Sequence, residues 1–278
     1  MPELPEVETV RRGLAPVMEG AVFQTVTLNR PDLRFPFDPN FIARIQGQRL
    51  IKLTRRAKFL QAELSSGERL FMHLGMSGRF IIDHSSTAQF VNEHKADPKH
   101  HHVVFTMENG AVITFNDPRR FGFMELAAKD AAYRLDHIGP EPLSNSFNGP
   151  VLRKALRGKK SKIKAALLDQ RIVAGLGNIY VCEALFRTGV SPRRAAGRLK
   201  VAETDALARN IKAVLTEAIE AGGSSLRDFS NTDGKLGYFQ HNFDVYGREG
   251  QACPICADPI QRLVQSGRSS FFCRVCQT

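Results

Sequence analysis

The chain has 278 residues, of which 42% are hydrophobic and 24% are charged, a composition that excludes a disordered or collagen-like protein. No stretch approaches the roughly 20 apolar residues that span a bilayer, so we expect no membrane-spanning segment. The first ten residues, MPELPEVETV, lack the basic flank and apolar core of a secretory signal, and we expect an intracellular protein.

The formal net charge of +11 is concentrated in the second half of the chain. Residues 1–139 carry 18 basic and 16 acidic side chains, whereas residues 140–278 carry 21 and 12. A basic excess of this kind is typical of proteins that bind polyanions, with nucleic acid the first candidate. A solvated basic surface without a partner would have the same composition.

A short helix is predicted at the N-terminus. Pro5 suits the first turn, and Val7, Val10 and Leu14 share one face at helical spacing. Glu6 lies where a carboxylate favours the positive end of the helix dipole. We therefore expect this helix to hold residues 2 and 3 against the body of the protein.

The rest of the first half is predicted to form strands. Runs rich in β-branched and aromatic residues occur at 21–28, 49–53, 59–64, 69–74 and 79–82. Two further runs, 102–107 and 111–115, flank Asn109 and Gly110. Asn-Gly is the strongest short-range hairpin signal because both residues tolerate positive φ. Many short antiparallel strands predict a sandwich or a barrel.

From about residue 150 the hydrophobic pattern changes to the helical period. Helices are predicted over 151–157, 163–171, 179–187 and 199–221, with Gly222 and Gly223 ending the last. Residues 137–150 are rich in Pro, Gly and Asn, as expected of a linker between domains.

Four of the five cysteines form two CxxC pairs near the C-terminus: Cys253, Cys256, Cys273 and Cys276. This spacing is typical of a zinc site with four thiolates, which has no open position and is therefore structural. A pair of disulfides or unconnected thiols is the alternative. Arg268, on the hairpin expected between the pairs, could reach a phosphate or could be an ordinary surface arginine. The fifth cysteine, Cys182, lies on the apolar side of a predicted helix, where it would serve packing.

Two loops could contact nucleic acid. Gly175 and Gly177 precede a helix that begins near Asn178, and free backbone N–H groups at a helix N-terminus bind anions. Arg119 and Phe121 follow a strand, where Arg can hydrogen-bond an orphaned base and Phe can wedge between base pairs. An ordinary glycine turn and a loop with Phe121 in the core are the alternatives.

The N-terminus itself could be a nucleophile. Removal of Met1 is expected because Pro2 is small, which leaves Pro2 with a free secondary amine beside Glu3. An α-amino group has a reference pKa of about 7.7–8.0, so a useful fraction is unprotonated near neutral pH. Such an amine can attack the anomeric carbon of a sugar, and Glu3 can transfer protons. A helix-initiating proline followed by a dipole-matching Glu would have the same sequence.

Taken together, these motifs closely resemble formamidopyrimidine-DNA glycosylase, a bacterial base-excision-repair family that acts on oxidised purines. The resemblance rests on PELPEVET at residues 2–9, RRAKFL at 55–60, HLGMSG at 73–78, DPRRFG at 117–122, GLGNIY at 175–180, DGKLGYF at 233–239 and the terminal cysteine pairs.

The resemblance implies an α+β multidomain protein. An N-terminal antiparallel β-sandwich would cover 1–136, a linker 137–150, a helix–two-turns–helix module 151–243 and a four-cysteine zinc finger 244–278. One structural Zn²⁺, no organic cofactor, damaged double-stranded DNA as partner, a monomeric state and a cytoplasmic location are likewise implied.

Specific residues also acquire roles from the resemblance. Pro2 is implied as the Schiff-base nucleophile, Glu3 as the proton donor in base release and Glu6 as a support. Lys58 is implied as the proton donor for β-elimination and Arg268 for δ-elimination. Met76, Arg119 and Phe121 would fill the gap left by the extruded nucleotide. The implied phosphate contacts are His100, Lys159, Asn178 and Arg268, with Lys164 near the nucleotide pocket and residues 231–238 closing over 8-oxoguanine.

Two departures from the family pattern bear on these roles. Leu236 stands where proline is frequent, which would loosen the closing loop. Three consecutive histidines, His100 to His102, leave open which of His100 and His102 meets phosphate. A metal site there is not expected, because strand alternation points the middle ring to the opposite face.

Two alternative functions remain. A related branch, the endonuclease VIII-like enzymes, removes oxidised pyrimidines with the same nucleophile and zinc finger. PELPEVE, the Arg-Arg-Phe turn and the DGK-GYF loop favour the purine branch. The second alternative is a zinc-containing DNA-binding protein without catalytic activity.

Overall fold

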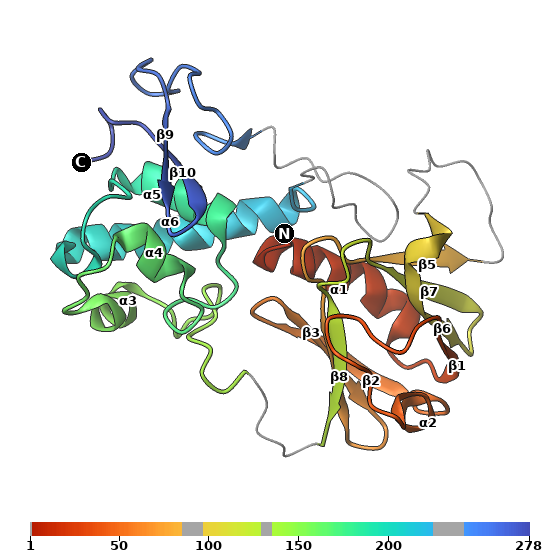
Figure 1. Cartoon of the computed structure of the whole chain (residues 1–278). Coiled ribbons are helices and arrows are strands. Elements are labelled where there is room, and N and C mark those ends of the chain that lie inside the picture. The colour runs from red at the N-terminus through yellow and green to blue at the C-terminus, as the bar shows by residue number, and fades with distance from the viewer. Residues whose placement is uncertain (1, 85–96, 129–134, 225–241) are drawn as a thin grey trace. The chain divides into compact units, whose positions relative to one another are not determined.

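The computed structural model describes residues 2–84, 97–128, 135–224 and 242–278. The chain divides into two compact units. The first comprises Met1–Leu135 and Ala221–Tyr238, and the second comprises Asp136–Glu220 and Phe239–Thr278. The chain therefore returns to the first unit after α6, the longest helix of the second (Figure 1).

The predicted N-terminal helix is confirmed. It is α1, Leu4–Met18, and Pro5 lies in its first turn. Val7, Val10 and Leu14 are buried in the core of the first unit, as their spacing predicts. Residues 2 and 3 are buried as well, so the N-terminal end of this helix is held within the fold.

The first unit contains two four-stranded antiparallel sheets. One has the order β1-β6-β7-β5 and the other the order β2-β3-β4-β8. The first sheet consists of β1 (Phe23–Leu28), β6 (His101–Met107), β7 (Ala111–Asn116) and β5 (Arg79–His84). The second consists of β2 (Leu50–Arg56), β3 (Phe59–Leu64), β4 (Arg69–His73) and β8 (Phe123–Ala127).

A single hydrophobic core joins the two sheets and α1. It contains Phe23 and Phe105 from one sheet and Leu53 and Met72 from the other. The rings of Phe23 and Phe105 pack edge to face at 5.3 Å. The strand pattern predicted a sandwich or a barrel, and the N-terminal antiparallel β-sandwich that the family resemblance implies is confirmed.

The Asn-Gly hairpin is confirmed between β6 and β7, with Phe105 opposite Ile113. Only Gly110 of the two turn residues has a positive φ, 83°. Asn109 instead uses its side chain, which accepts from the amide of Ala111 and donates to the carbonyl of Val17. Helix α2 (Phe41–Ile45) and strand β8 were not predicted.

The helices of the second unit also agree with the predictions in number and order. They are α3 (Gly149–Leu156), α4 (Ile163–Leu168), α5 (Asn178–Thr188) and α6 (Val201–Glu220). The apolar stripe of α6, which includes Leu207, Ile211 and Leu215, is buried. Two short 3-10 helices, η1 (Pro98–His100) in the first unit and η2 (Ala196–Arg198) in the second, also occur in the described ranges. Nowhere in the described ranges is a helix both long and apolar enough to cross a membrane.

A two-stranded hairpin lies between the cysteine pairs, as predicted. Strand β9 (Gln261–Gln265) pairs antiparallel with β10 (Arg268–Phe272). The two turn residues, Ser266 and Gly267, have φ values of 49° and 73°. Positive φ at both positions is typical of a tight turn that matches the twist of the strands, and it places Arg268 at the exposed end of the hairpin.

Candidate functional site

The predicted nucleophile and proton donor lie directly in front of α1. Pro2 and Glu3 are both buried, and Glu3 occupies the position that caps the helix. The amide of Glu3 donates to Glu6 Oε2 at 2.8 Å, while the carbonyl of Glu3 accepts from the amide of Val7. Pro2 and Glu3 therefore have a defined position, in contrast to the loose terminal residues of most domains.

Glu6 connects this end of the chain to a segment more than 200 residues away. Its second carboxylate oxygen, Oε1, accepts from both the amide and the hydroxyl of Ser224 at 2.9 Å. Gly223 packs against the same side chain, since a Cβ there would lie 3.3 Å from Glu6 Cγ. Glu6 thus anchors residues 223 and 224 to the N-terminal helix, inside the first unit. The family resemblance implied a supporting role for Glu6, but nothing in the sequence indicated its partner Ser224.

Lys58 lies at the tip of the β2–β3 hairpin and is buried. The preceding residue, Ala57, has a φ of 53°, which non-glycine residues rarely adopt. Arg55 holds this turn, since it donates to the carbonyl of Ala57 at 2.9 Å and forms an ion pair with Glu8 on α1. Backbone strain maintained by such contacts is typical of functional sites.

His73 is a neighbour of Lys58 that the sequence analysis did not assign. Its ring stacks on Phe123 at 5.2 Å and packs against Phe59. Burial lowers the pKa of His73 to about 4, and the positive charge of Lys58 adds to this effect. His73 is therefore neutral near pH 7, and its Nδ1 accepts from the amide of Gly75 at 3.0 Å. The position of His73 at the start of the HLGMSG motif was the sequence signal that could have identified it as a site residue.

The three residues predicted to fill the gap in the duplex lie on two loops. Met76 is half-buried in the loop after β4, and Arg119 and Phe121 are exposed in the loop after β7. The Arg119 guanidinium lies over the Phe121 ring, 5.0 Å from its centroid. Phe121 is 42% exposed, so its ring is outside the core. This excludes the alternative interpretation of Phe121 as a core residue.

The histidine run has one ring at the surface and one in the interior. His102 is buried, and its Nε2 donates to the carbonyl of Asp117 at 2.9 Å. His100 is half-buried at the end of η1, with its ring centroid 6.3 Å from that of His102. Of the two candidates for a phosphate contact, His100 is thus the more accessible.

A second group of predicted residues lies in the second unit, around β10. The Asn178 side chain, in the first turn of α5, donates to the carbonyl of Ser269 at 3.0 Å. Lys164 on α4 donates to the same carbonyl and to Ser270 Oγ, both at 2.7 Å. Both residues therefore fix the strand that begins at Arg268.

Lys164, which the resemblance places near the nucleotide pocket, lies in the interior of the second unit. It is 0% exposed, and its ammonium points to the finger strand. Helix α4 has one face in the interior, and Lys164 lies on that face with Ile163 and Leu167. Lys159, by contrast, is half-buried in the loop after α3.

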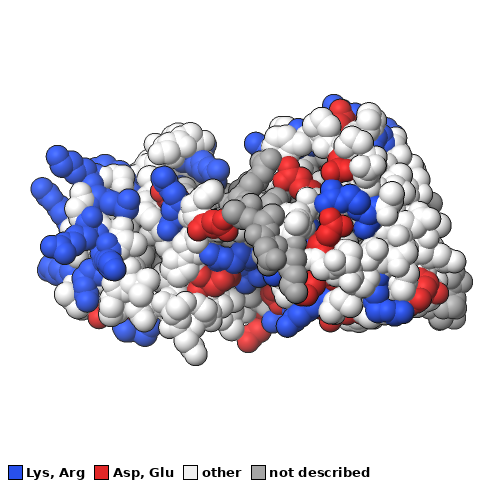
Figure 2. All heavy atoms as spheres, turned by 90° about the horizontal axis from the view of Figure 1, so that it is seen from below, with Lys and Arg blue, Asp and Glu red and all other residues white. Residues whose placement is uncertain are grey.

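Basic side chains gather on the second unit. Figure 2 shows Lys and Arg over this unit with few acids among them on the face displayed. The loop that contains Lys159 lies beside the loop that contains Gly197. The amide of Gly197 donates a hydrogen bond to the carbonyl of Lys159. The exposed cations of these loops are Arg157, Lys160, Lys162, Arg198 and Lys200.

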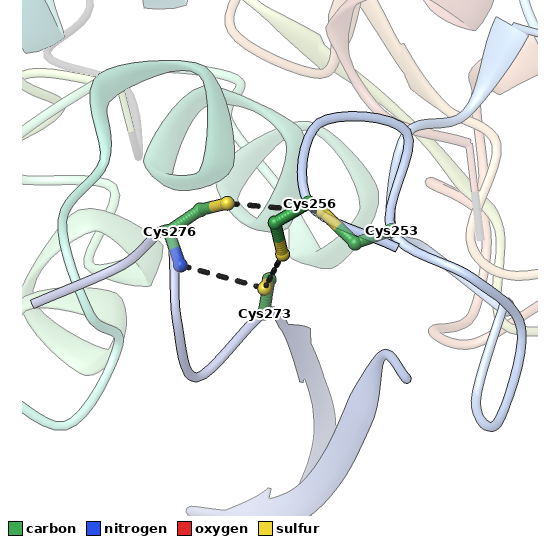
Figure 3. Close-up of side chains that lie close together, drawn as sticks. All are labelled: Cys253, Cys256, Cys273 and Cys276. Carbon is green, nitrogen blue, oxygen red and sulfur yellow. Dashed lines mark hydrogen bonds between the residues drawn. The ribbon is translucent and has the colours of Figure 1, made fainter. Parts of the chain in front are cut away.

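The four predicted metal ligands converge (Figure 3). Their sulfur atoms all lie within 4.8 Å of one another. Cys253 Sγ lies 3.9 Å from Cys276 Sγ, and Cys256 Sγ lies 3.4 Å from Cys273 Sγ. Four thiolates about 2.3 Å from a tetrahedral Zn²⁺ would be about 3.8 Å apart, so the arrangement fits zinc. No cysteine is in a disulfide. Cys182 is buried in the adjoining apolar cluster, as expected of a packing residue.

The predicted site residues thus form two groups, one in each unit. Pro2, Glu3, Lys58, Met76, His100, Arg119 and Phe121 belong to the first unit, whereas Lys159, Lys164, Asn178, Arg268 and the cysteines belong to the second. The predicted closing loop at 231–238, including Leu236, lies outside the described residues.

Sequence models of three known domains match consecutive parts of the chain. Residues 1–124 match the formamidopyrimidine-DNA glycosylase N-terminal domain, and residues 138–230 match the formamidopyrimidine-DNA glycosylase H2TH domain. Residues 250–278 match a zinc finger found in FPG and IleRS. The boundaries at 136, 150 and 243 themselves stay a prediction.

Full-length relatives and solved structures agree with these matches. A formamidopyrimidine-DNA glycosylase of Ruegeria pomeroyi is 60% identical over 282 residues, which cover all of both chains. The crystal structure of MutM (Fpg) from Thermus thermophilus has 40% identity and a TM-score of 0.86, over 99% of this chain and 98% of that one. Lactococcus lactis Fpg (MutM), in complex with N7-benzyl-Fapy-dG DNA, has 34% identity and a TM-score of 0.87 over 99% of both.

Proposed function

Because this chain belongs to the formamidopyrimidine-DNA glycosylase family, we propose that it excises oxidised purines such as 8-oxoguanine and formamidopyrimidines from duplex DNA and then cleaves the strand. Family membership makes it a DNA glycosylase of base excision repair. The strand cleavage is the further step, and the buried Pro2–Glu3 terminus held by Glu6 is the observation that carries it.

Damaged double-stranded DNA is the proposed partner. A related protein of the same fold binds damaged DNA in its solved complex, and the second unit carries the exposed cations that phosphates attract. We assign His100, Lys159 and Asn178 to phosphate contacts. Lys164 would act on DNA only through β10, which it holds from the interior. The protein would work as a monomer in the cytoplasm.

Base release would begin with extrusion of the damaged nucleotide, which costs a few kcal/mol of stacking and pairing. Met76, Arg119 and Phe121 would occupy the vacated space and offset that cost. The Pro2 amine then forms a bond to C1′ while the bond from C1′ to the base breaks. Glu3, the next residue, would supply the proton that the departing base needs.

Strand cleavage would follow from the covalent intermediate. After the sugar ring opens, the positively charged iminium between Pro2 and C1′ makes the C2′ proton acidic. Loss of that proton expels the 3′ phosphate, and a second elimination along the conjugated chain expels the 5′ phosphate. Lys58 is assigned to proton transfer in the first elimination and Arg268 to the second. Hydrolysis finally releases Pro2.

The four cysteines would hold one structural Zn²⁺ as thiolates. With four protein ligands the ion supplies a cross-link and no open coordination position. The finger has only the short β9–β10 hairpin and a small apolar cluster, so the cross-link would supply much of its folding free energy. The turn between β9 and β10 would then present Arg268 at the end of the hairpin.

The covalent step is tested by trapping with borohydride, which reduces an iminium to a stable amine. We expect the protein to form an adduct with DNA containing 8-oxoguanine, and mass spectrometry to locate the bond at Pro2. Pro2→Gly and a version with an N-terminal tag should both lose most of the adduct. An equally strong adduct from the tagged protein would overturn Pro2 as the nucleophile.

Substrate preference is tested separately with the same protein. Excision of 8-oxoguanine opposite cytosine is compared with excision of thymine glycol. We expect the purine lesion to be removed faster. A clear preference for thymine glycol would instead assign the chain to pyrimidine repair, and DNA binding without excision of either lesion would indicate a protein without catalytic activity.

A further inference from the structure

A buried carboxylate lies where the two loops that carry Met76, Arg119 and Phe121 meet. We name them the Met76 loop (residues 74–78) and the Arg119 loop (residues 117–122). Asp117 is 0% exposed, and its Oδ1 accepts from Ser77 Oγ at 2.6 Å. Its Oδ2 accepts from the amide of Gly122 at 2.8 Å. One side chain therefore ties the Met76 loop to the far end of the Arg119 loop.

Ser77 completes this connection from the opposite loop. It is 5% exposed, and its hydroxyl, while it donates to Asp117, accepts from the backbone amide of Arg119 at 3.1 Å. The Met76 loop thus holds the backbone of Arg119, whose guanidinium is exposed at the surface. Ser77 and Asp117 are both too deeply buried to touch a ligand themselves.

The backbone of Asp117 is held by the end of η1, by strand β6 and by its own turn. Its amide donates to the carbonyl of His100 at 3.1 Å. Its carbonyl accepts from His102 Nε2 at 2.9 Å and from the amide of Arg120 at 3.2 Å. All four polar atoms of Asp117 therefore have hydrogen-bond partners, which satisfies the condition for a stable buried polar network.

Close backbone packing of the two loops makes the geometry sensitive to small shifts. A Cβ on Gly75 would lie 2.3 Å from the nitrogen of Gly122, so only glycine fits at this contact. Arg120 has a φ of 56°, which turns the chain sharply between Arg119 and Phe121. The backbones of the two loops are therefore in direct contact at Gly75 and Gly122.

From these contacts we propose that Asp117 and Ser77 are positioning residues, which hold Met76, Arg119 and Phe121 as one preformed wedge for the duplex. This inference rests on the function proposed above. A wedge already ordered in the free protein loses little conformational freedom when it enters DNA, so more of its contact energy is available to offset unstacking. Reactions on DNA that need no extrusion from a duplex should not depend on it.

The test compares two substrates under single-turnover conditions. One is duplex DNA with 8-oxoguanine opposite cytosine, which requires the wedge. The other is a single-stranded oligonucleotide with an abasic site, which requires Pro2 and Lys58 but no wedge. We expect Ser77→Ala to slow duplex excision by about tenfold or more, since small misplacements have effects of this order, while single-strand cleavage stays within about twofold. Asp117→Asn can still accept a hydrogen bond from the amide of Gly122. Its rate of duplex excision should therefore lie between those of Ser77→Ala and the wild type.

A matched control separates positioning from general destabilisation. Ile113→Val removes one methylene from the core of the first unit, on β7, without touching either loop. It should slow both reactions equally or neither. As a direct readout, 2-aminopurine next to the lesion should become less fluorescent in complexes of Ser77→Ala than in wild-type complexes, because its neighbour remains stacked.

The outcomes distinguish this inference from the proposed function. If the wild-type protein forms no trapped adduct, the proposed function fails and the wedge with it. If the wild type is active but Ser77→Ala slows both substrates by the same factor, or leaves both unchanged, the positioning role alone is overturned. A selective loss on the duplex, with unchanged cleavage of the single strand, supports it.

Discussion

At the scale of single residues, the carboxylate of Glu6 accepts three hydrogen bonds from two distant parts of the chain. It accepts from the amide of Glu3 with one oxygen and from the amide and hydroxyl of Ser224 with the other. A buried acceptor with three donors cannot be replaced without leaving a donor unsatisfied, at about 1–3 kcal/mol. The orientation of Glu3, and through it of Pro2, depends on this side chain.

We expect Glu6→Gln to reduce the yield of trapped adduct and to lower the free energy of unfolding by about 1–3 kcal/mol, because the amide of Gln opposes a donor. The coupling with Ser224 is measured by a double-mutant cycle with Ser224→Ala, by urea unfolding. The two changes should be non-additive by about 0.5–3 kcal/mol. Strict additivity would show that the 2.9 Å contacts contribute nothing.

His73 predicts a dependence of stability on pH. The pKa of His73 is about 4 in the folded chain, below its ordinary value of 6.5. Between these values the unfolded chain binds a proton that the folded chain does not, so stability falls as the pH is lowered from 6.5 toward 4. The full effect is about 3 kcal/mol at most. His73→Asn cannot titrate and still offers an acceptor to the amide of Gly75.

The measurement is urea unfolding at several pH values between 4 and 7. The difference in stability between wild type and His73→Asn should be largest near pH 7 and shrink on acidification. His137→Asn, at an exposed histidine, is the matched control. Curves that run parallel for wild type and His73→Asn would contradict the lowered pKa.

Sequence reasoning succeeded for residues whose role depends on local pattern and failed where it depends on the fold. The cysteine spacing predicted the convergent sulfur atoms. Lys164 is buried on α4 although it follows other lysines in the sequence, so its local pattern gave no sign of this burial. Asp117 and Ser77 are 40 positions apart in the chain, so no local signal could pair them.

At the scale of elements, α5 provides the anchor for the finger. Glu183 is buried and accepts from the amides of Asp244, Val245 and Tyr246. Burial raises the pKa of Glu183, and these three hydrogen bonds oppose the rise. The Tyr246 ring in turn packs edge to face on Phe271 of β10, at 5.1 Å. The helix therefore fixes the chain immediately before the metal site.

We expect Glu183→Gln to release zinc to a chelator faster than wild type, because at least one buried amide loses its acceptor at about 1–3 kcal/mol. A colorimetric chelator follows the release. Glu217→Gln, at an exposed acid that pairs with Arg187, is the control and should release zinc at the wild-type rate. Equal rates for Glu183→Gln and wild type would show that the anchor does not stabilise the finger.

The elements missed by the sequence analysis have physical reasons. Strand β8, Phe123–Ala127, contains Met, Glu, Leu and Ala, which favour helices, and it becomes a strand because it pairs with β4. Helix α2 spans only Phe41–Ile45, too short for a periodic pattern. By contrast, α1 and the β6–β7 hairpin carry complete local signals and were predicted closely.

At the scale of the whole molecule, the uneven charge predicts how DNA affinity responds to salt. Each phosphate neutralised by Lys or Arg releases counterions, so the logarithm of the affinity falls linearly with the logarithm of the salt concentration. We expect Lys160→Gln and Arg198→Gln each to reduce the slope by about one. Arg171→Gln, where the guanidinium is already paired with Asp169, should leave it unchanged. Fluorescence anisotropy at several salt concentrations measures the slopes, and an unaltered slope in all three would contradict the basic surface as the phosphate contact.

The division into units could be anticipated only in part. The switch from strand pattern to helix pattern near residue 150 predicted two structural classes in sequence order. The sequence does not indicate that residues 221–224 belong to the first unit. Helix α6 ends at Glu220 and is followed by glycines, a pattern that is common at helix ends wherever the chain goes next. The tertiary contacts of Gly223 and Ser224 with Glu6 reveal this return to the first unit.

This return has a consequence for biosynthesis. The ribosome delivers Pro2 and Glu3 first, but Ser224, which bonds their supporting carboxylate, emerges only after four-fifths of the polypeptide has been made. At 5–20 residues per second, the nascent terminus waits about ten seconds or longer for that partner. The proposed role of Pro2 requires removal of the initiator methionine, and this interval precedes the contact with Ser224 that completes the hydrogen bonding of Glu6.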